Sequence, residues 1–265
     1  MKSPQRIGII GYGYIGRHII EQIRAQPDIL DLAFINCRDR KHVRDFDDMV
    51  FLEDLSKCAD CEPDLILEAA HPIITETYGK AFLEVCDYLP LSTSSLIDKA
   101  YVDVLQKTAL KFSTKLFLPA GALIGGEEFI KRTIPWQRVR ITFRKNPRNI
   151  DFSTSGINVA GLDKSVTVFE GTVTEVAQKF PRNVNTMVTA ALLSTGPDEC
   201  EGVLIADPDL NCAVAEVEAW STDGSYFRTE KRQPAQGVSG TEMLDSAWYS
   251  LKRALNISEE CWRVV

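Results

Sequence analysis

The sequence lacks an apolar run of membrane-spanning length and an excess of basic residues. A transmembrane helix needs roughly 18 or more consecutive apolar residues, and no segment approaches that length. Lys and Arg number 30 against 37 Asp and Glu, a formal net charge of −7, whereas a nucleic-acid surface needs a dominant basic face. Residues 1–6 lead straight into an apolar segment without the layout of a signal peptide. We therefore expect a cytoplasmic protein that binds no membrane and no nucleic acid.

Cysteine is present, but not in the pattern of a disulfide framework or a zinc site. The seven cysteines are odd in number and scattered over 265 residues, and a chain of this length can bury enough apolar surface to fold without cross-links. Cys58 and Cys61 form a C-x-x-C. A zinc site would need a second pair and a redox site a thioredoxin-like setting, so we expect free thiols in a reducing compartment and no metal.

The rhythm of apolar residues changes near the middle of the chain. The first part alternates short apolar strands with helical patterns, which is typical of a parallel α/β sheet. After about Gly126 the strands alternate apolar and polar residues, which indicates a mixed sheet with one solvated face. We predict a Rossmann-like NAD(P)-binding domain over residues 1–125 and an α+β substrate and oligomerisation domain over residues 126–241. The helical segment 242–265 can extend from the second domain back to the first and pack on it.

The same periodicities place the individual elements. The expected strands are Arg6–Ile10, Leu32–Asn36, Met49–Phe51, Asp64–Ala70, Leu89–Thr93, Lys115–Leu118, Val139–Phe143, Thr167–Phe169, Val203–Ala206, Val214–Trp220 and Tyr226–Glu230. The expected helices are Tyr14–Ala25, Ile73–Cys86, Asp98–Phe112, Thr172–Lys179, Asn185–Leu193 and Glu242–Leu255.

A glycine-rich turn joins the first expected strand to the first helix. Gly11-Tyr12-Gly13-Tyr14-Ile15-Gly16 has the G-x-G-x-x-G spacing in the context that gives this pattern meaning. The first glycine permits the tight turn, the second lets a pyrophosphate approach the backbone, and the third lets helix and strand pack closely. We therefore expect Gly11, Gly13, Tyr14, Ile15 and Gly16 to bind a dinucleotide.

The end of the second strand bears on which dinucleotide is bound. An acidic residue there holds the ribose 2′-hydroxyl of NAD, but this chain has the uncharged Asn36, followed by Arg38 and Arg40. Arginine can pair with the 2′-phosphate of NADP. We expect NADP to be accepted at least as well as NAD, with Arg38 at the phosphate; the alternative is that both arginines merely solvate a loop.

Two further strands end in residues suited to a ligand. Ligands of open α/β sheets bind at the carboxyl ends of the strands, where Glu68-Ala69-Ala70-His71-Pro72 and Ser92–Ser95 lie. A small residue such as Ala69 lets a nicotinamide ring lie along the sheet edge. His71 is one of three histidines, and histidine is the usual base near neutral pH. The alternative for His71 is a helix-start residue that hydrogen-bonds to backbone.

The start of an expected helix in the second half offers a site for a carboxylate. Phe180-Pro181-Arg182-Asn183-Val184-Asn185-Thr186 precedes that helix, and Asn185 is placed to cap it. Its free N–H groups, its dipole and the nearby Arg182 favour an anion. We expect Arg182 and Thr186 to bind substrate; a plain capped helix is the alternative.

Taken together, these motifs resemble the L-aspartate dehydrogenase family. The resemblance rests on G-Y-G-Y-I-G, E-A-A-H-P, P-A-G-A-L (119–123), V-F-E-G (168–171), F-P-R-N-V-N-T and A-D-P (206–208), in family order over nearly the whole chain. It implies NAD(P)-dependent oxidative deamination of L-aspartate to iminoaspartate, which hydrolyses to oxaloacetate and ammonia or feeds NAD biosynthesis. By motif, Ala122 and Asn185 match positions that contact the cofactor.

The chain departs from the family at the residue assigned to catalysis. The family has a histidine shortly after D-P in an N-x-H pattern, and here that place falls to Ala215, or to Ala213 if the loop is shorter. His71 then becomes the candidate for the catalytic base. Two other functions stay open: an oxidoreductase with another small substrate, and a dinucleotide-binding protein without turnover. Alternating strands also leave a sheet face that a second subunit of a homodimer would cover.

Overall fold

The computed structural model describes residues 3–43, 46, 50–121, 123–157, 161–236 and 239–257. The chain divides into two compact units. The first comprises Met1–Ser92, Ala100–Pro119 and Leu244–Val265, and the second comprises Thr93–Lys99 and Ala120–Met243. A compact unit is defined by its internal contacts and not by its function. The assignment of nucleotide binding to residues 1–125 and of substrate binding and oligomerisation to residues 126–241 therefore stays a prediction.

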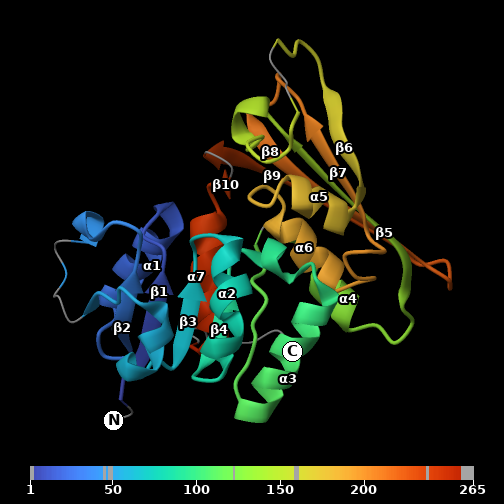
Figure 1. Ribbon diagram of the computed structural model, residues 1–265. Coiled ribbons are helices and arrows are strands. Elements are labelled where there is room, and N and C mark those ends of the chain that lie inside the picture. The colour runs from blue at the N-terminus through green and yellow to red at the C-terminus, as the bar shows by residue number, and fades with distance from the viewer. Residues whose placement is uncertain are drawn as a thin grey trace. The chain divides into compact units, whose positions relative to one another are not determined.

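The first unit contains a parallel sheet of four strands in the order β2-β1-β3-β4 (Figure 1). The strands are β1 (Gln5–Ile10), β2 (Leu30–Asn36), β3 (Leu65–Glu68) and β4 (Asp87–Pro90), and the helices are α1 (Tyr14–Arg24), α2 (Pro72–Leu83), α3 (Lys99–Phe112) and α7 (Met243–Ala254). Ile7 and Ile9 are fully buried, and Ala247 and Leu251 of α7 belong to the same apolar core. The continuous apolar strands thus form the Rossmann-like sheet that the sequence predicts.

Two expected strands of this unit are too short to join the sheet. Phe51 forms a single bridge with Ile35, and Leu116 forms one with Tyr88. Met49, the first residue of the first segment, lies outside the described residues. The second segment runs only a few residues before Pro119, which has no N–H to continue a ladder. The prediction of Lys115–Leu118 as a full strand is therefore wrong, and within Met49–Phe51 the described residues form one bridge rather than a strand.

The second unit contains a mixed sheet of six strands in the order β10-β9-β8-β5-β7-β6. Strand β5 pairs with β7 in parallel and with β8 in antiparallel orientation. The strands are β5 (Trp136–Lys145), β6 (Val166–Thr172), β7 (Glu201–Ala206), β8 (Cys212–Ser221), β9 (Tyr226–Gln236) and β10 (Ser239–Gly240), and the helices are α4 (Glu127–Ile130), α5 (Val173–Lys179) and α6 (Asn185–Leu192). Strands β8 and β9 are antiparallel, and the turn between them includes Gly224, which has a φ of 83°.

The two faces of this sheet differ in polarity because its strands alternate. Buried Val139, Ile141 and Phe143 of β5 share one core with residues of α5 and α6, such as Val176 and Met187. The opposite face carries ion pairs: Arg138–Glu201 and Arg228–Glu216 join neighbouring strands, and Arg140–Glu170 spans β7. One solvated and one covered face is the arrangement expected of an antiparallel or mixed sheet.

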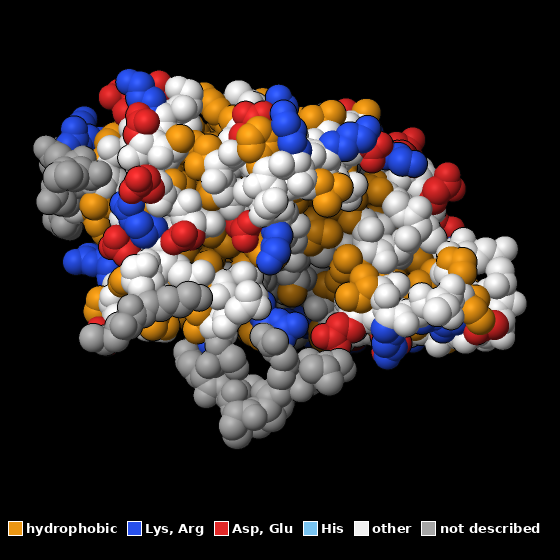
Figure 2. Space-filling model, turned by 90° about the horizontal axis from the view of Figure 1, so that it is seen from below, with side chains coloured by type: hydrophobic (Ala, Val, Ile, Leu, Met, Phe, Trp, Pro, Cys, Tyr) orange, Lys and Arg blue, Asp and Glu red, His pale blue; other side chains and the backbone are white. Residues whose placement is uncertain are grey.

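The surface carries charges of both signs. Acidic and basic side chains are interspersed on the face shown in Figure 2, and the described basic side chains form no continuous patch on it. Among the described helices, none is long and apolar enough to cross a membrane.

Candidate active site

The glycine turn of the first unit combines two packed glycines with an open one. Gly11 has a φ of 106°, and a Cβ at this position would lie 2.5 Å from the carbonyl oxygen of Ala69. A Cβ on Gly16 would overlap the carbonyl of Gly11, whereas a Cβ on Gly13 would meet nothing within 4 Å. The backbone is therefore tightly packed beneath the turn and open at Gly13.

Helix α1 begins directly after this opening. Gly13 occupies its N-cap position without a side-chain hydrogen bond, so Tyr14, Ile15 and Gly16 present first-turn N–H groups that have no partner within the helix. An open backbone at the positive end of a helix dipole fits a pyrophosphate. The turn thus has the shape and the donors that a dinucleotide requires.

Asn36, at the end of β2, has a structural role. The side-chain amide of Asn36 donates to the carbonyl of Leu52 at 2.9 Å, so it tethers the following loop. Arg38 and Arg40 are both exposed, and the guanidinium of Arg40 also lies 5.4 Å from the centre of the Phe51 ring. Both charges therefore face water, and that of Arg40 is in addition held against an aromatic ring.

The carboxyl ends of β3 and β4 are joined by a buried glutamate that the sequence analysis did not single out. Oε1 of Glu68 accepts the N–H groups of Ala70 at 2.6 Å and His71 at 2.7 Å and the hydroxyl of Ser92 at 3.0 Å. Oε2 accepts the N–H of Ser92 at 3.1 Å. Glu68 is fully buried, and burial raises the pKa of its carboxyl. Four hydrogen bonds from two segments fix the backbone that carries Ala69 and His71.

His71 occupies the N-cap position of α2. Its Nδ1 accepts the N–H of Ile73 at 3.3 Å, and its side chain is exposed. An accepting Nδ1 places the proton of a neutral imidazole on Nε2. The ring would have to change tautomer and give up the cap before Nε2 could accept a proton.

In the second unit, Asn185 fastens a neighbouring segment instead of capping its helix. Val184 is the N-cap residue of α6, and Asn185 is the first helical residue. The backbone carbonyl of Asn185 accepts the hydroxyl of Thr93 at 2.6 Å, and its side-chain Oδ1 accepts the N–H of Ser94 at 3.1 Å. The prediction of Asn185 as a cap is therefore wrong, because the Ser94 N–H takes the oxygen that a cap would use.

Thr186 and the P-A-G-A-L loop are in close contact. Gly121 has a φ of 59°, and a Cβ placed on it would lie 2.5 Å from Oγ1 of Thr186. The loop can therefore approach α6 only with glycine at this position. Ala122, the predicted cofactor contact, lies outside the described residues.

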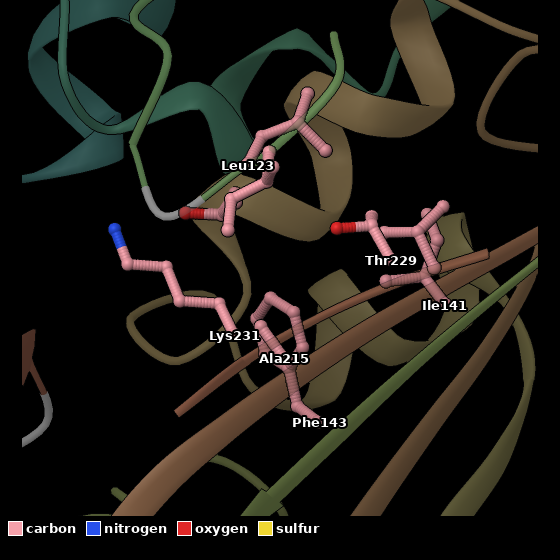
Figure 3. A pocket seen from close by; sticks show the side chains of 9 residues that line it. Leu123, Ile141, Phe143, Ala215, Thr229 and Lys231 are labelled. Atoms are coloured by element: carbon pink, nitrogen blue, oxygen red, sulfur yellow. The ribbon is translucent and has the colours of Figure 1, made fainter. Parts of the chain in front are cut away.

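A pocket opens between this loop, the start of α6 and the covered face of the sheet. Its lining residues are Leu123, Ile124, Ile141, Phe143, Thr186, Ala215, Val217, Thr229 and Lys231. The structure thus brings together Thr186 and Ala215, two positions that the sequence singles out, and adds Lys231, which it does not. Figure 3 shows the side chain of Lys231 ending far from Ile141, on the other side of the pocket.

Arg182 is not among the residues that line this pocket. Its guanidinium pairs with the Asp151 carboxylate at 2.9 Å, and more than half of the Arg182 side chain is exposed. The expected role of Arg182 in substrate binding therefore competes with an existing ion pair.

Ala213 is the other position at which the resemblance implies the family histidine. It lies two residues before Ala215 on β8, so its side chain is on the same face of the sheet. Ala213 pairs with Gln233, whose buried Oε1 has no hydrogen-bond partner among the described residues. Arg144 pairs with Val214, so Lys145 and Ala213 occupy the next step of the ladder. Lys145 is buried and donates to the carbonyl of Asn183 at 3.2 Å. Burial lowers the pKa of its ammonium to about 8.

Two known protein families match this chain, one in its first half and one in its second half. Residues 11–119 match the family described as "Homoserine dehydrogenase, NAD binding domain", and residues 131–254 match "Aspartate dehydrogenase, C-terminal". The first match agrees with the open glycine turn and identifies NAD or NADP as the cofactor.

Individual relatives span nearly the whole chain. An aspartate dehydrogenase domain-containing protein of Xenopus tropicalis is 33% identical over 93% of this chain and 93% of its own length. An L-aspartate dehydrogenase of Methanosarcina mazei is 27% identical over 95% and 97%, respectively. The crystal structure of aspartate dehydrogenase from Thermotoga maritima has a TM-score of 0.75 at 22% identity and covers 98% of this chain and 99% of its own. This structural likeness shows a shared fold.

Proposed function

Because this chain belongs to the aspartate dehydrogenase family and uses NAD or NADP, we propose that it oxidises L-aspartate to iminoaspartate, which water converts to oxaloacetate and ammonia. The observation that supports the proposal is the pocket lined by both Thr186 and Ala215; Ala215 is one of the two positions, with Ala213, at which the family resemblance implies a histidine. An NAD(P)-dependent oxidoreductase needs such a substrate pocket in addition to its nucleotide turn.

The bound nicotinamide supplies the chemistry by accepting a hydride from Cα of the substrate. The residues proposed to hold the cofactor are Gly11, Gly13, Tyr14, Ile15, Gly16, Arg38, Ala69, Ala122 and Asn185. Glu68 positions Ala69 through the hydrogen bonds to Ala70 and His71. The protein's contribution is to fix both reactants, because correct orientation removes most of the entropic barrier of a two-molecule reaction.

We propose His71 as the group that takes a proton from the substrate amine, with a bound water as the relay. Its cap hydrogen bond makes this role testable, since capping and proton transfer can be separated by mutation. Asparagine can cap a helix but cannot act as a base. If His71 is the base, His71→Asn and His71→Ala both lower kcat by about 10²- to 10⁴-fold. If His71 only caps α2, His71→Asn keeps kcat within threefold.

Turnover of a substrate panel tests the proposed activity. L-aspartate, other amino acids and short hydroxy acids are each supplied with NAD and with NADP, and the reduced nicotinamide is followed by its absorbance. We expect L-aspartate to give the highest kcat/KM. Faster turnover of another substrate favours an oxidoreductase of different specificity. Calorimetric binding of the cofactor without turnover of any substrate favours a non-catalytic dinucleotide-binding protein.

The proposal includes a cytoplasmic homodimer. The sheet face opposite α5 and α6 is the surface that a second subunit would cover, with its ion pairs such as Arg138–Glu201. Sedimentation of the wild type at low and high salt measures the state. A monomer at micromolar concentration in both conditions contradicts this part of the proposal.

A further inference from the structure

Lys231 is the one charged residue among the nine that line the pocket of the second unit. It lies on β9 directly across from Ala215 on β8, and Ala215 in turn pairs with Phe143 on β5. Directly paired residues of antiparallel strands bring their Cβ atoms within about 5.5 Å of one another. A cation thus adjoins Ala215, one of the two positions at which the family resemblance implies a histidine.

The short side chain of Ala215 leaves space beside this cation. The surrounding wall is apolar where Ile141, Phe143 and Val217 contribute, and it is polar at Thr186 and Thr229. A small molecule with an anionic group that faces Lys231 and polar groups that face the two hydroxyls fits this lining.

In the structure Lys231 is paired with a residue that can leave it. The ammonium of Lys231 contacts the carboxylate of Glu242, and about half of the Glu242 side chain is exposed, against 19% of the Lys231 side chain. An exposed carboxylate regains its hydration when it leaves an ion pair, whereas the more buried ammonium needs a new anion. A carboxylate that enters the pocket provides one.

We propose that Lys231 anchors a carboxylate group of the substrate in this pocket, in exchange for Glu242. The ligand class is a short carboxylic acid, and the inference rests on the proposed function, in which the substrate is a four-carbon amino dicarboxylate. Specificity for an acidic substrate would thus come from β9, the strand next to β8, on which Ala215 lies.

Binding of succinate tests the proposal without any turnover. Succinate has four carbons and two carboxylates but no amine to oxidise, so calorimetry on the full chain saturated with NADPH reports on carboxylate binding alone. We expect Lys231→Met to weaken succinate binding at least tenfold, because a charged hydrogen bond is lost. We expect Glu242→Gln to tighten it two- to fivefold, because the competing carboxylate is removed.

Arg232→Met is the matched control. Arg232 follows Lys231 on β9, points to the other face of the sheet and pairs with Glu230 at 2.6 Å, so succinate binding should change less than twofold. The proposal is overturned if Lys231→Met binds succinate within twofold of the wild type, or if the wild type does not bind succinate at 10 mM.

A second pair of variants avoids mutation of Lys231 itself. Ala215→Asp places a carboxylate opposite Lys231, where it should satisfy the ammonium, raise Tm and abolish succinate binding. Ala215→Asn adds the same volume without charge and should weaken succinate binding without raising Tm. Equal Tm values for the two variants contradict an anion site at Lys231.

These outcomes differ from those of the proposed function. If L-aspartate is not a substrate but succinate binding depends on Lys231, the carboxylate site stands and the assigned reaction fails. If L-aspartate is oxidised and Lys231→Met changes neither its KM nor succinate binding, the reaction stands and the assigned anchor fails. NADPH affinity, measured on each variant, should stay within twofold because none of these residues belongs to the glycine turn.

Discussion

The glycine turn of the first unit and the pocket of the second present their functional groups in opposite ways. The turn offers backbone: a Cβ would clash at Gly11 and Gly16 but has room at Gly13, and the first N–H groups of the helix that follows have no partner within it. The pocket offers side chains, with Lys231 and Thr186 set among apolar residues. A backbone site is specified by where side chains are missing, whereas a side-chain site depends on residues brought together from distant segments.

Alanine substitution at two glycines gives the largest expected effect and separates packing from ligand contact. Gly16→Ala forces a methyl group into the carbonyl of Gly11. We expect it to lose NADPH affinity by more than 100-fold and to lower the free energy of unfolding by roughly 1–3 kcal/mol or more, as overpacking does. Calorimetric binding and urea unfolding measure the two quantities.

Gly13→Ala is the matched case, because its Cβ meets nothing within 4 Å. We expect the free energy of unfolding to fall by no more than about 1 kcal/mol, the typical cost of alanine at an N-cap position, and NADPH affinity to fall at least tenfold where the methyl group meets the pyrophosphate. Unaltered NADPH binding by Gly13→Ala would show that the phosphates lie elsewhere.

Mutation of Glu68 tests whether the backbone of the nucleotide site in the first unit depends on a side chain that holds it in place. Glu68→Gln replaces one acceptor oxygen with an NH₂ group, which then faces a donor from Ala70, His71 or Ser92. A buried donor left without an acceptor costs about 1–3 kcal/mol. We expect a loss of this size in urea unfolding and weaker NADPH binding through the shifted Ala69.

Ser92→Ala is the milder control, since it removes only the hydroxyl that donates to Glu68 at 3.0 Å and leaves the Ser92 N–H in place. It should lose less stability than Glu68→Gln. A Glu68→Gln protein that is as stable as the wild type would argue against the buried carboxylate as the anchor of this loop.

A smaller effect is expected on the preference between NADPH and NADH. This preference depends on a side chain, Arg38, whereas binding of the pyrophosphate depends on the backbone of the glycine turn. Arg38 is exposed, and its charge is the feature expected to prefer a 2′-phosphate. We expect Arg38→Ser to lower affinity for NADPH relative to NADH by about tenfold, or about 1.4 kcal/mol, with NADH affinity unchanged. A wild type that prefers NADH by tenfold or more contradicts this assignment before any mutation is made.

Much of the fold could be predicted because its elements carry strong local patterns. Strands β1, β2 and β8 and helices α1 and α6 follow the apolar periodicity of their own residues to within a few positions. Phe51 and Leu116 were misjudged, since three or four apolar residues satisfy a strand pattern without deciding whether a ladder forms.

The candidate site was predictable in the first unit and only partly in the second. Gly11–Gly16 form a contiguous motif, whereas the paired neighbours of Ala215 come from two other strands, β5 and β9, and depend on register. A signal for Lys231 did exist. It shares the parity of Phe227 and Thr229 on β9, so alternation places its side chain on the covered face of the sheet. A lysine at an inward position is the pattern that could have marked the site.

Lys145 has the same signal and provides the last test. It shares the parity of the buried Val139, Ile141 and Phe143, and burial lowers its pKa from 10.5 to about 8. Between these values the unfolded chain binds more protons than the folded one, so this group makes stability rise with pH. From pH 7 to 9.5 its contribution grows by about 2 kcal/mol, at 1.36 kcal/mol per pKa unit of difference.

Lys145→Met should therefore be more stable than the wild type at pH 7 and lose that advantage by pH 9.5. The loss of the hydrogen bond to Asn183 reduces the gain at pH 7 by about 1 kcal/mol. Lys164→Met, in an exposed segment, should show no such dependence. Because buried thiols titrate at alkaline pH as well, the stability difference between variant and wild type is the quantity to follow. A difference that is constant with pH would mean that Lys145 stays protonated, and its ammonium would then be a second cation on the face that carries Lys231.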